Sequence, residues 1–286
     1  MIMRVATAKE LCRNHSVRQV CRLLGVNRSR LYYALSPKRD LTPLCRFVET
    51  IRVTLPQAGV PTLYEIVKRY QLDYSRREVS QAYRTLGILG KRPLRKPKTT
   101  NSRHPHPVYP DLVKGLRIKR PNQVWATDVT WVRISGRWAY LALIEDLYTR
   151  RIVGWSLSKS NDLFLCVFAL EMALDHGTPE IHHSDQDTSY ASPKYIRRLL
   201  DLGIAVSMTM TGSPWDNGFV ERLNRTLKHE EVLLSEYQSL EEARTNIASW
   251  VELYNHGRPH SALDYCTPME FYEMYEAEPK PGEQSP

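Results

Sequence analysis

The sequence predicts an α/β protein in which a mixed-sheet core follows two all-α helix-turn-helix units. Residues 1–90 carry only helical periodicity, whereas residues 122–208 alternate between strand-like and helical runs. The charge also changes sign along the chain: Lys and Arg number 26 against 7 acids in residues 1–120, but 14 against 24 in the remainder. A basic arm joined to an acidic body indicates a polyanion-binding part and a cation-holding part.

The first unit, residues 1–40, is expected to be a helix-turn-helix. Residues 4–13 look helical, Ser16 is placed to cap a helix over 17–24, and the turn at 25–27 contains glycine and leads into a basic helix over 28–35. Such a pair of helices is a common way to enter the DNA major groove. An ordinary helical hairpin is the alternative, but the arginines favour DNA contact: Arg18, Arg22, Arg28 and Arg30.

The second unit, residues 41–90, is expected to hold helices over 43–53, 61–70 and 76–86. Ser75 with Glu78 three residues later is a capping box, which places the start of the third helix. Arg76 and Arg77 make this unit a second candidate for DNA binding.

Residues 91–120 carry ten Lys or Arg, one acid and several prolines, which predicts an extended tether. The tether is expected to follow a phosphate backbone, and a passive linker is the alternative. Its candidate DNA contacts are Lys91, Arg92, Arg95, Lys96 and Lys98.

The core is expected over residues 121–235. Its pattern predicts strands over 124–134, 137–145, 151–157, 181–183 and 205–208, with helices over 162–176, 193–202 and 217–234. That order describes a mixed sheet with helices on its faces. A helical extension is expected over 236–275, with a helix over 240–254, and the acidic tail 276–286 is expected to be disordered.

Three carboxylates in this core stand in different local settings. Asp128 lies inside a strand, Asp185 ends a short strand, and Glu221 lies one turn into a helix. A fold that gathers such carboxylates needs a divalent cation to offset their repulsion, so a metal-dependent reaction on a phosphodiester is the leading hypothesis. Glu145 and Asp146 are competitors for the role of Asp128, although Asp146 is expected to pair with Arg150 or Arg151, and Glu221 considered alone is typical of a surface residue.

The compartment is expected to be a reducing cytoplasm. The five cysteines are odd in number and scattered, and no Cys-x-x-Cys pair exists, so neither disulfides nor a zinc module are expected. No apolar run approaches the roughly 18 residues that a transmembrane helix needs, so no membrane partner is expected.

Five separated motifs then converge on one family. They are Trp125-x-x-Asp128-x-Thr130, His183-Ser-Asp185, Gly212-Ser-Pro-Trp-Asp-Asn217 followed by Glu221, Thr226-Leu-Lys228, and Tyr254-Asn-x-x-Arg-Pro-His-Ser-Ala-Leu263. From Ser16 to about Tyr272 the chain resembles the bacterial insertion-sequence transposases of the second-reading-frame (OrfB) type in the IS-three family. Their catalytic core is RNase H-like and similar to that of retroviral integrases. The 35 residues between Asp185 and Glu221 match the family spacing, but Asp187 stands where the family usually has a glycine that suggests a positive φ.

The resemblance implies an Mg²⁺-dependent enzyme that cuts double-stranded DNA at the element ends and joins those ends to target DNA. Two ions are implied, with Mn²⁺ able to substitute; Asp128 would bridge them, Asp185 would hold one and Glu221 the other. Asn217, Arg225 and Lys228 are the implied DNA contacts near the cut. A homo-oligomer and a first-reading-frame partner, or a frameshift fusion to it, are the implied protein partners.

Two other functions stay open at this point. One is a DNA-binding regulator whose core has lost activity, because Asp187 adds a negative charge beside the expected metal site. The other is an RNase H-like nuclease on RNA–DNA hybrids; the helix-turn-helix arm argues against it, because hybrids are recognised by shape and not by a helix in a major groove.

Overall fold

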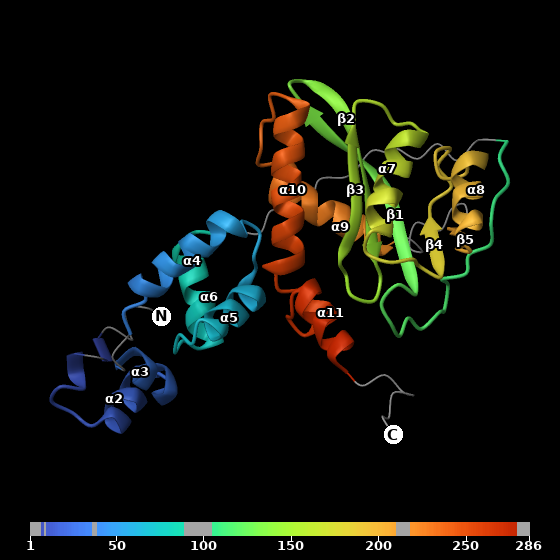
Figure 1. The fold of residues 1–286 in the computed structure, drawn as a ribbon. Helices are drawn as coiled ribbons and strands as arrows, with labels where there is room; N and C mark the ends of the chain where they lie inside the picture. Colours follow the sequence, from blue (N-terminus) through green and yellow to red (C-terminus); the bar gives the residue numbers. More distant parts are fainter. Residues whose placement is uncertain (1–6, 9, 36–38, 89–104, 210–217, 279–286) are drawn as a thin grey trace. The chain divides into compact units, whose positions relative to one another are not determined.

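The computed structural model describes residues 7–8, 10–35, 39–88, 105–209 and 218–278. The chain divides into two compact units, Met1–Arg46 and Phe47–Pro286, which are described separately (Figure 1). Of the sequence predictions, most of the first half of the tether, most of the acidic tail and part of the helix over 4–13 fall outside the described residues.

The first unit holds the two helices of the predicted helix-turn-helix, α2 (Val17–Leu24) and α3 (Arg28–Leu35). The Ser16 hydroxyl accepts the Gln19 N–H at 3.4 Å, as its capping position predicts. Gly25 ends α2 at φ +62°, a left-handed conformation that glycine adopts without steric cost and that starts the turn. A small core of Ala8, Val20, Cys21 and Leu31 holds these helices together.

The second unit begins within α4 (Thr42–Thr54) and continues with α5 (Val60–Arg69) and α6 (Arg76–Thr85). The predicted capping box is present: the Ser75 hydroxyl accepts the Glu78 N–H at 3.3 Å, and the Glu78 carboxylate accepts the Ser75 N–H at 2.8 Å.

The five strands are β1 (Val124–Ile134), β2 (Arg137–Asp146), β3 (Ile152–Ser158), β4 (Ile181–Ser184) and β5 (Ala205–Met208). Their order in the sheet is β3-β2-β1-β4-β5. The first three strands pair antiparallel, as consecutive strands joined by short turns do, and β4 and β5 join them in parallel through helical connections. The predicted mixed sheet is therefore confirmed, and β1 lies at its centre.

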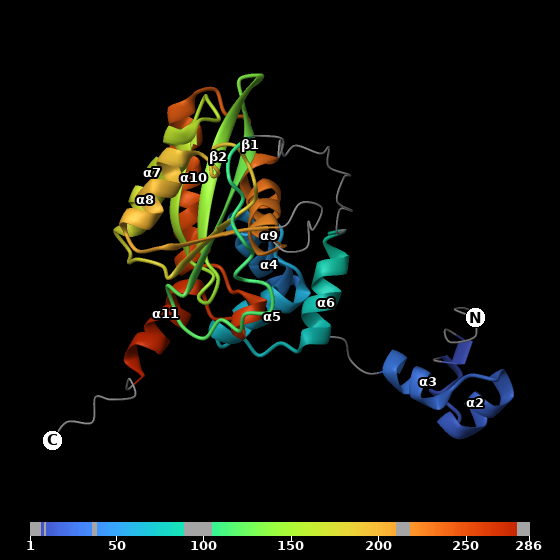
Figure 2. The ribbon, with the colours of Figure 1, turned by 90° about the vertical axis from the view of Figure 1, so that its right-hand side faces the viewer.

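Helices cover both faces of this sheet (Figure 2). The helices α7 (Leu163–Leu174) and α8 (Pro193–Asp201) cover one face, and α9 (Gly218–Leu227) lies on the other. Gly154 in β3 permits the close approach of α7, because a Cβ at that position would come within 2.2 Å of the Ala169 carbonyl oxygen.

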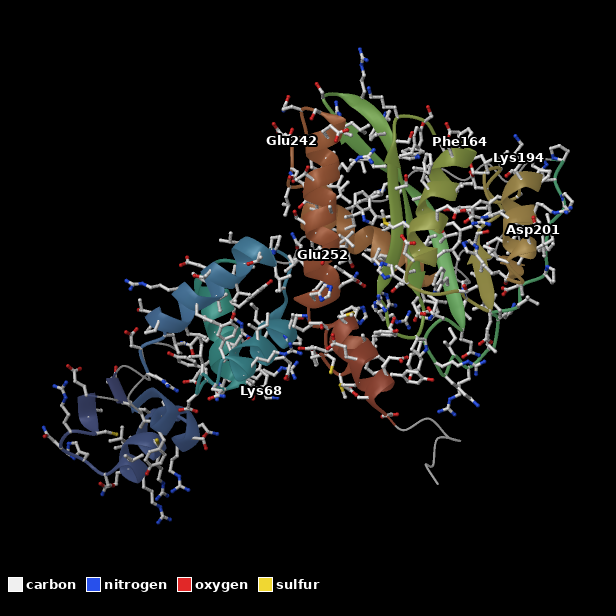
Figure 3. All side chains as sticks on the ribbon, in the orientation of Figure 1. Lys68, Phe164, Lys194, Asp201, Glu242 and Glu252 are labelled. Carbon is white, nitrogen blue, oxygen red and sulfur yellow. The ribbon has the colours of Figure 1, made fainter. Side chains whose placement is uncertain are left out.

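The C-terminal extension consists of α10 (Leu240–His256), a short 3₁₀ turn η2 (Ser261–Leu263) and α11 (Pro268–Ala277). The helix α10 lies beside β3 and shares a buried cluster with α9. Exposed acids occur along α10, with Glu242 towards one end and Glu252 towards the other (Figure 3). Among the described residues, no helix has the length and apolar character needed to span a membrane.

The helix that carries Glu221 is shorter than predicted. Its α-helical part ends at Leu227 and continues as one wide π-helical turn, η1 (Lys228–Val232), instead of reaching residue 234. An α-helix that reached residue 234 would carry Leu227 and Leu234 on the same apolar face, but Leu227 is buried whereas Leu234 is 54% exposed. The wide turn carries the buried Glu230, which forms an ion pair with the distant Arg258. Helical periodicity alone does not predict this pair.

The end of the expected tether also differs from the prediction. Tyr109, Val113 and Ile118 pack against the core, and the Leu112 N–H donates to the Ser207 hydroxyl at 2.9 Å. These apolar contacts hold the segment against the core, although its charge and prolines suggested an extended chain.

Candidate active site

Asp128 lies at the middle of the central strand, on the sheet face that α9 covers. Alternation along β1 directs Trp125 into the cluster under α7 and leaves Asp128 on the opposite face. There its Oδ2 accepts the Asn224 Nδ2–H of α9 at 2.7 Å. The carboxylate is partly exposed, so it is accessible from outside the protein.

Asp185 directly follows β4, the strand that pairs in parallel with β1 through Ala126 and His183. Its Oδ1 accepts the backbone N–H of Asp187 at 3.0 Å, which fixes the carboxylate at the end of the strand. The parallel register therefore places Asp185 on the strand next to Asp128.

Asp187 is a turn residue in this structure. Its φ is not in the left-handed region, so the expected need for a glycine-like backbone is wrong for this chain. Its own carboxylate accepts the Ser189 N–H at 3.0 Å, and its carbonyl accepts the Ala191 N–H at 3.0 Å. These bonds give the Asp187 side chain a local structural role.

Glu221 lies in the first turn of α9 and keeps part of its side chain exposed. The neighbouring Val220, Leu223 and Leu227 are buried and hold the other side of the helix against the sheet. Packing of this apolar face fixes the rotation of α9 about its axis, and thereby the direction in which Glu221 projects.

The electrostatics of Asp128 show that the fold brings these carboxylates together. Burial, followed by the negative charge of Asp185 and then that of Glu221, raises the pKa of Asp128 to about 8. The hydrogen bond from Asn224 opposes this rise, because it stabilises the charged form. Three elements far apart in sequence thus contribute carboxylates whose charges repel one another.

This carboxylate set has the chemistry of a hard-cation site, because its ligands are all oxygens. In the described part of the chain, no three His, Cys, Asp or Glu side chains are close enough to hold one ion as they stand. The repulsion at Asp128 nevertheless fits a bound divalent cation, which would offset it. The set therefore suits Mg²⁺ or Mn²⁺.

Asn224 is a site residue that the sequence reasoning did not assign. It is 2% exposed, and in the described structure its Oδ1 has no hydrogen-bond partner while its Nδ2 binds Asp128. Asn224 follows Glu221 by three residues, so the two lie close together on the helix surface. That spacing is the sequence signal that could have identified Asn224 as a site residue.

The competing acids of β2 do not belong to this set. Glu145 is buried, and its burial raises its pKa to about 7, but it does not contribute to the pKa of Asp128. Asp146 accepts the N–H groups of Asn122, Tyr148 and Thr149, which corrects the expected pairing with an arginine. Its buried carboxylate organises the turn after β2 instead.

The predicted DNA contacts occupy varied positions. Three of them are exposed on the helix-turn-helix: Arg18, Arg22 and Arg28. Arg76 and Arg77 are exposed at the start of α6. On the Glu221 helix and the turn that follows it, Arg225 is exposed and Lys228 is partly buried. The remaining candidates lie outside the described residues, as does the side chain of Arg30: Lys91, Arg92, Arg95, Lys96, Lys98 and Asn217.

Comparison with known proteins defines the class. Two family models, both described as integrase core domain, match residues 118–214 and 202–268. The chain is also similar to a solved chain in the simian T-cell lymphotropic virus intasome in complex with PP2A regulatory subunit B56 gamma. That match has a TM-score of 0.50 and 16% identity, and it covers 86% of this chain and 77% of the other. The mixed sheet with its carboxylates is therefore an integrase-type, RNase H-like core.

Two relatives narrow the class to a family. The transposase for insertion sequence element IS904 of Lactococcus lactis is 32% identical over 200 residues, which cover 68% of this chain and 79% of the relative. Transposase InsF for insertion sequence IS3A of Escherichia coli is 28% identical over 269 residues, or 90% and 93% of the two chains. The chain belongs to the bacterial insertion-sequence transposases with a retroviral-integrase-like core.

Proposed function

We propose that this transposase cuts DNA at the ends of its own element and joins those ends to target DNA, with Asp128, Asp185 and Glu221 as its catalytic residues. One observation supports this assignment above the others: burial, and after it the charges of Asp185 and Glu221, raise the pKa of Asp128. Such convergence of carboxylates from two strands and a helix is costly unless a cation is bound there, and it is typical of a functional site.

The residues that would hold divalent ions follow from the same geometry. Asp128 would be a ligand of two Mg²⁺ ions, Asp185 would hold one of them and Glu221 the other, and Mn²⁺ would be able to replace Mg²⁺. When bound, a pair of such ions stabilises both the attacking and the leaving oxygen of an in-line displacement at phosphorus.

The protein's own residues orient this site and its substrate. Asn224 fixes the Asp128 carboxylate, and the Asp187 N–H fixes that of Asp185. Arg225 and Lys228, further along the Glu221 helix, contact the phosphates that flank the cut, with Asn217 ahead of it. A water-dependent cut leaves a free 3′-hydroxyl on the element end. That hydroxyl then attacks a phosphodiester of the target, forms the new bond and displaces one target strand.

The basic arm binds the double-stranded element ends. The exposed Arg18, Arg22 and Arg28, together with Arg30, enter or flank a groove, and Arg76, Arg77 and the basic segment from Lys91 follow the phosphate backbone. Two ends must be held at once for joining, so the protein acts as a homo-oligomer, with or without a first-reading-frame partner. DNA binding of this kind places it at the nucleoid.

The test uses linear DNA carrying the sequences that flank the gene, incubated with the full chain and Mg²⁺, with every new 3′-end mapped. We expect cuts at the element boundaries, joined products, and neither with EDTA. Asp128→Asn, Asp185→Asn and Glu221→Gln should each abolish both steps and leave end binding intact. Binding without any cut in Mg²⁺ or Mn²⁺ would favour an inactive regulator, whereas preferential cutting of an RNA–DNA hybrid would favour a nuclease.

A further inference from the structure

The motif from Tyr254 to Leu263 has no part in the chemistry proposed above. It begins in the last turn of α10 and continues through η2. Two of its polar residues are engaged in specific long-range bonds to the core, one to the sheet and one to the end of the Glu221 helix.

Asn255 binds the edge of the sheet. Its Oδ1 accepts the Ile152 N–H at 2.9 Å, and its Nδ2 donates to the Ile152 carbonyl at 2.9 Å. Because β3 is an edge strand, these are groups that a further strand would otherwise bind. An asparagine amide reproduces that strand-like pairing, so α10 is held at a fixed point along β3.

Arg258 binds the turn that follows the Glu221 helix. Its Nη2 donates to Glu230 Oε1 at 2.9 Å and its Nε to Oε2 at 3.0 Å, so the pair is bidentate. Glu230 lies in the π-helical turn that directly continues α9, and its side chain is only 5% exposed. A two-bond fork of this kind fixes orientation as well as distance.

Apolar packing completes the link between these two points. Leu223 and Leu227 of α9 share a buried cluster with Trp250, Val251 and Tyr254 of α10. A helix packed only by apolar side chains keeps some freedom to slide or tilt, since such contacts are not directional. The Arg258 bonds remove that freedom at the end of α9 far from Glu221, and the Asn255 bonds fix the segment that carries Arg258 on β3.

We propose that Arg258, whose segment Asn255 fixes on β3, is a positioning residue for Glu221, which it holds in place through α9. Glu221 and Glu230 are nine residues apart, or roughly 13 Å along a helix, so a tilt of about 5° moves Glu221 by about 1 Å. A displacement of about 1 Å in a catalytic group can reduce a rate by about a hundredfold. This inference rests on the proposed role of Glu221 as a metal ligand.

The test replaces the fork by apolar side chains of similar size in the full chain. Removal of Arg258 alone would leave a buried charge and risk unfolding, so the main variant is Glu230→Leu with Arg258→Met, which removes both charges together. Arg258→Lys is the milder variant, because it keeps the charge and loses the fork. The matched control is Glu171→Leu with Arg198→Met, which removes another bidentate pair, at 2.7 and 2.8 Å, between α7 and α8.

Two quantities are measured: the Mg²⁺ concentration for half-maximal cleavage, and amide hydrogen exchange of residues 218–227 in metal-free protein. We expect the half-maximal Mg²⁺ concentration to rise at least tenfold and exchange in α9 to become at least tenfold faster in the main variant. Arg258→Lys should show smaller changes of the same sign, and the control should show neither.

Unchanged exchange in α9 would overturn the inference, and so would faster exchange without a change in the Mg²⁺ requirement, because the pair would then be structural only. If the unmodified protein shows no Mg²⁺-dependent cleavage, the proposed function fails separately. The exchange measurement still decides in that case whether the fork restrains α9.

Discussion

Replacing Asp128 by asparagine should stabilise the metal-free protein while it removes activity. The pKa of this carboxyl is raised from 3.8 to about 8, so the folded state holds its proton more tightly than the unfolded state does. Below pH 4 both states are protonated and the charge costs nothing. Between pH 4 and 8 the unfolded state loses its proton first, so the free energy of unfolding falls as the pH rises.

The size of the effect follows from the shift. A displacement of about four pKa units corresponds to roughly 5–6 kcal/mol at about 1.4 kcal/mol per unit, which is an upper limit. Asp128 is partly exposed, so solvent screens part of the repulsion, and we expect about 2–4 kcal/mol above pH 8. The asparagine has no charge, and its Oδ1 still accepts the Asn224 amide, so the variant avoids the cost without losing the hydrogen bond.

The assay is urea unfolding of the core in EDTA, at pH 4.5 and at pH 8.5, for the unmodified protein and for Asp128→Asn. The variant should exceed the unmodified protein's free energy of unfolding by a small amount at the lower pH and by a much larger amount at the higher pH. Asp175→Asn, at the exposed end of α7, serves as the control and should show no pH-dependent gain. Added Mg²⁺ should stabilise the unmodified protein alone. A variant that gains nothing at pH 8.5 would refute the idea that the carboxylates repel one another.

Three further perturbations test the arm and the packing. The double variant Arg18→Ala with Arg22→Ala should lower the slope of log affinity against log salt for the element end by about 2 units, because each phosphate contact releases roughly one counterion. The slope is measured by fluorescence anisotropy, and an unchanged slope would show that these arginines do not bind phosphate. Gly154→Ala should cost about 1–3 kcal/mol or more by thermal unfolding, because its Cβ collides with the α7 backbone, and a neutral result would mean that the close approach is relaxed at no cost. Leu227→Ala should cost about 2–5 kcal/mol and Leu234→Ala under about 0.5 kcal/mol, since only the former is buried; equal costs would contradict the early end of the helix.

Local patterns predicted most of the elements of the core. The bounds of β1 agree residue for residue with the alternating run of its sequence, and the Ser75 capping box marks the start of α6. Both signals are contained within a few neighbouring residues, so no tertiary information is needed to recognise them. The three carboxylates could also be singled out from the sequence, because each stands in a distinct local setting, and their catalytic role stays a prediction.

The remaining features depend on contacts between distant residues. The π-helical turn holds a buried Glu230 whose partner is 28 residues away, and helical periodicity contains no sign of that partner. The Asn224 bond joins positions 96 residues apart, and only the structure shows which of the polar residues near Glu221 faces Asp128. The end of the expected tether differs from the prediction for a similar reason: composition reports charge and proline, but not the buried clusters of the core against which Tyr109 and Val113 pack.

The repulsion at Asp128 explains why the surrounding structure is so strongly constrained. A cluster of like charges opposes folding until a cation is bound, so its carriers would move apart if they were free to do so. Asp128 is held by its pairing with Leu143 of β2, and β1 also pairs with β4 up to Ala126, two residues before it. Glu221 can move, since a single helix carries it, and that helix is the element held by buried leucines at its centre and by a bidentate arginine beyond its end. Distant residues therefore restrain the helix that carries Glu221, which is the arrangement that the proposed function requires if a cation is to find this ligand already in place.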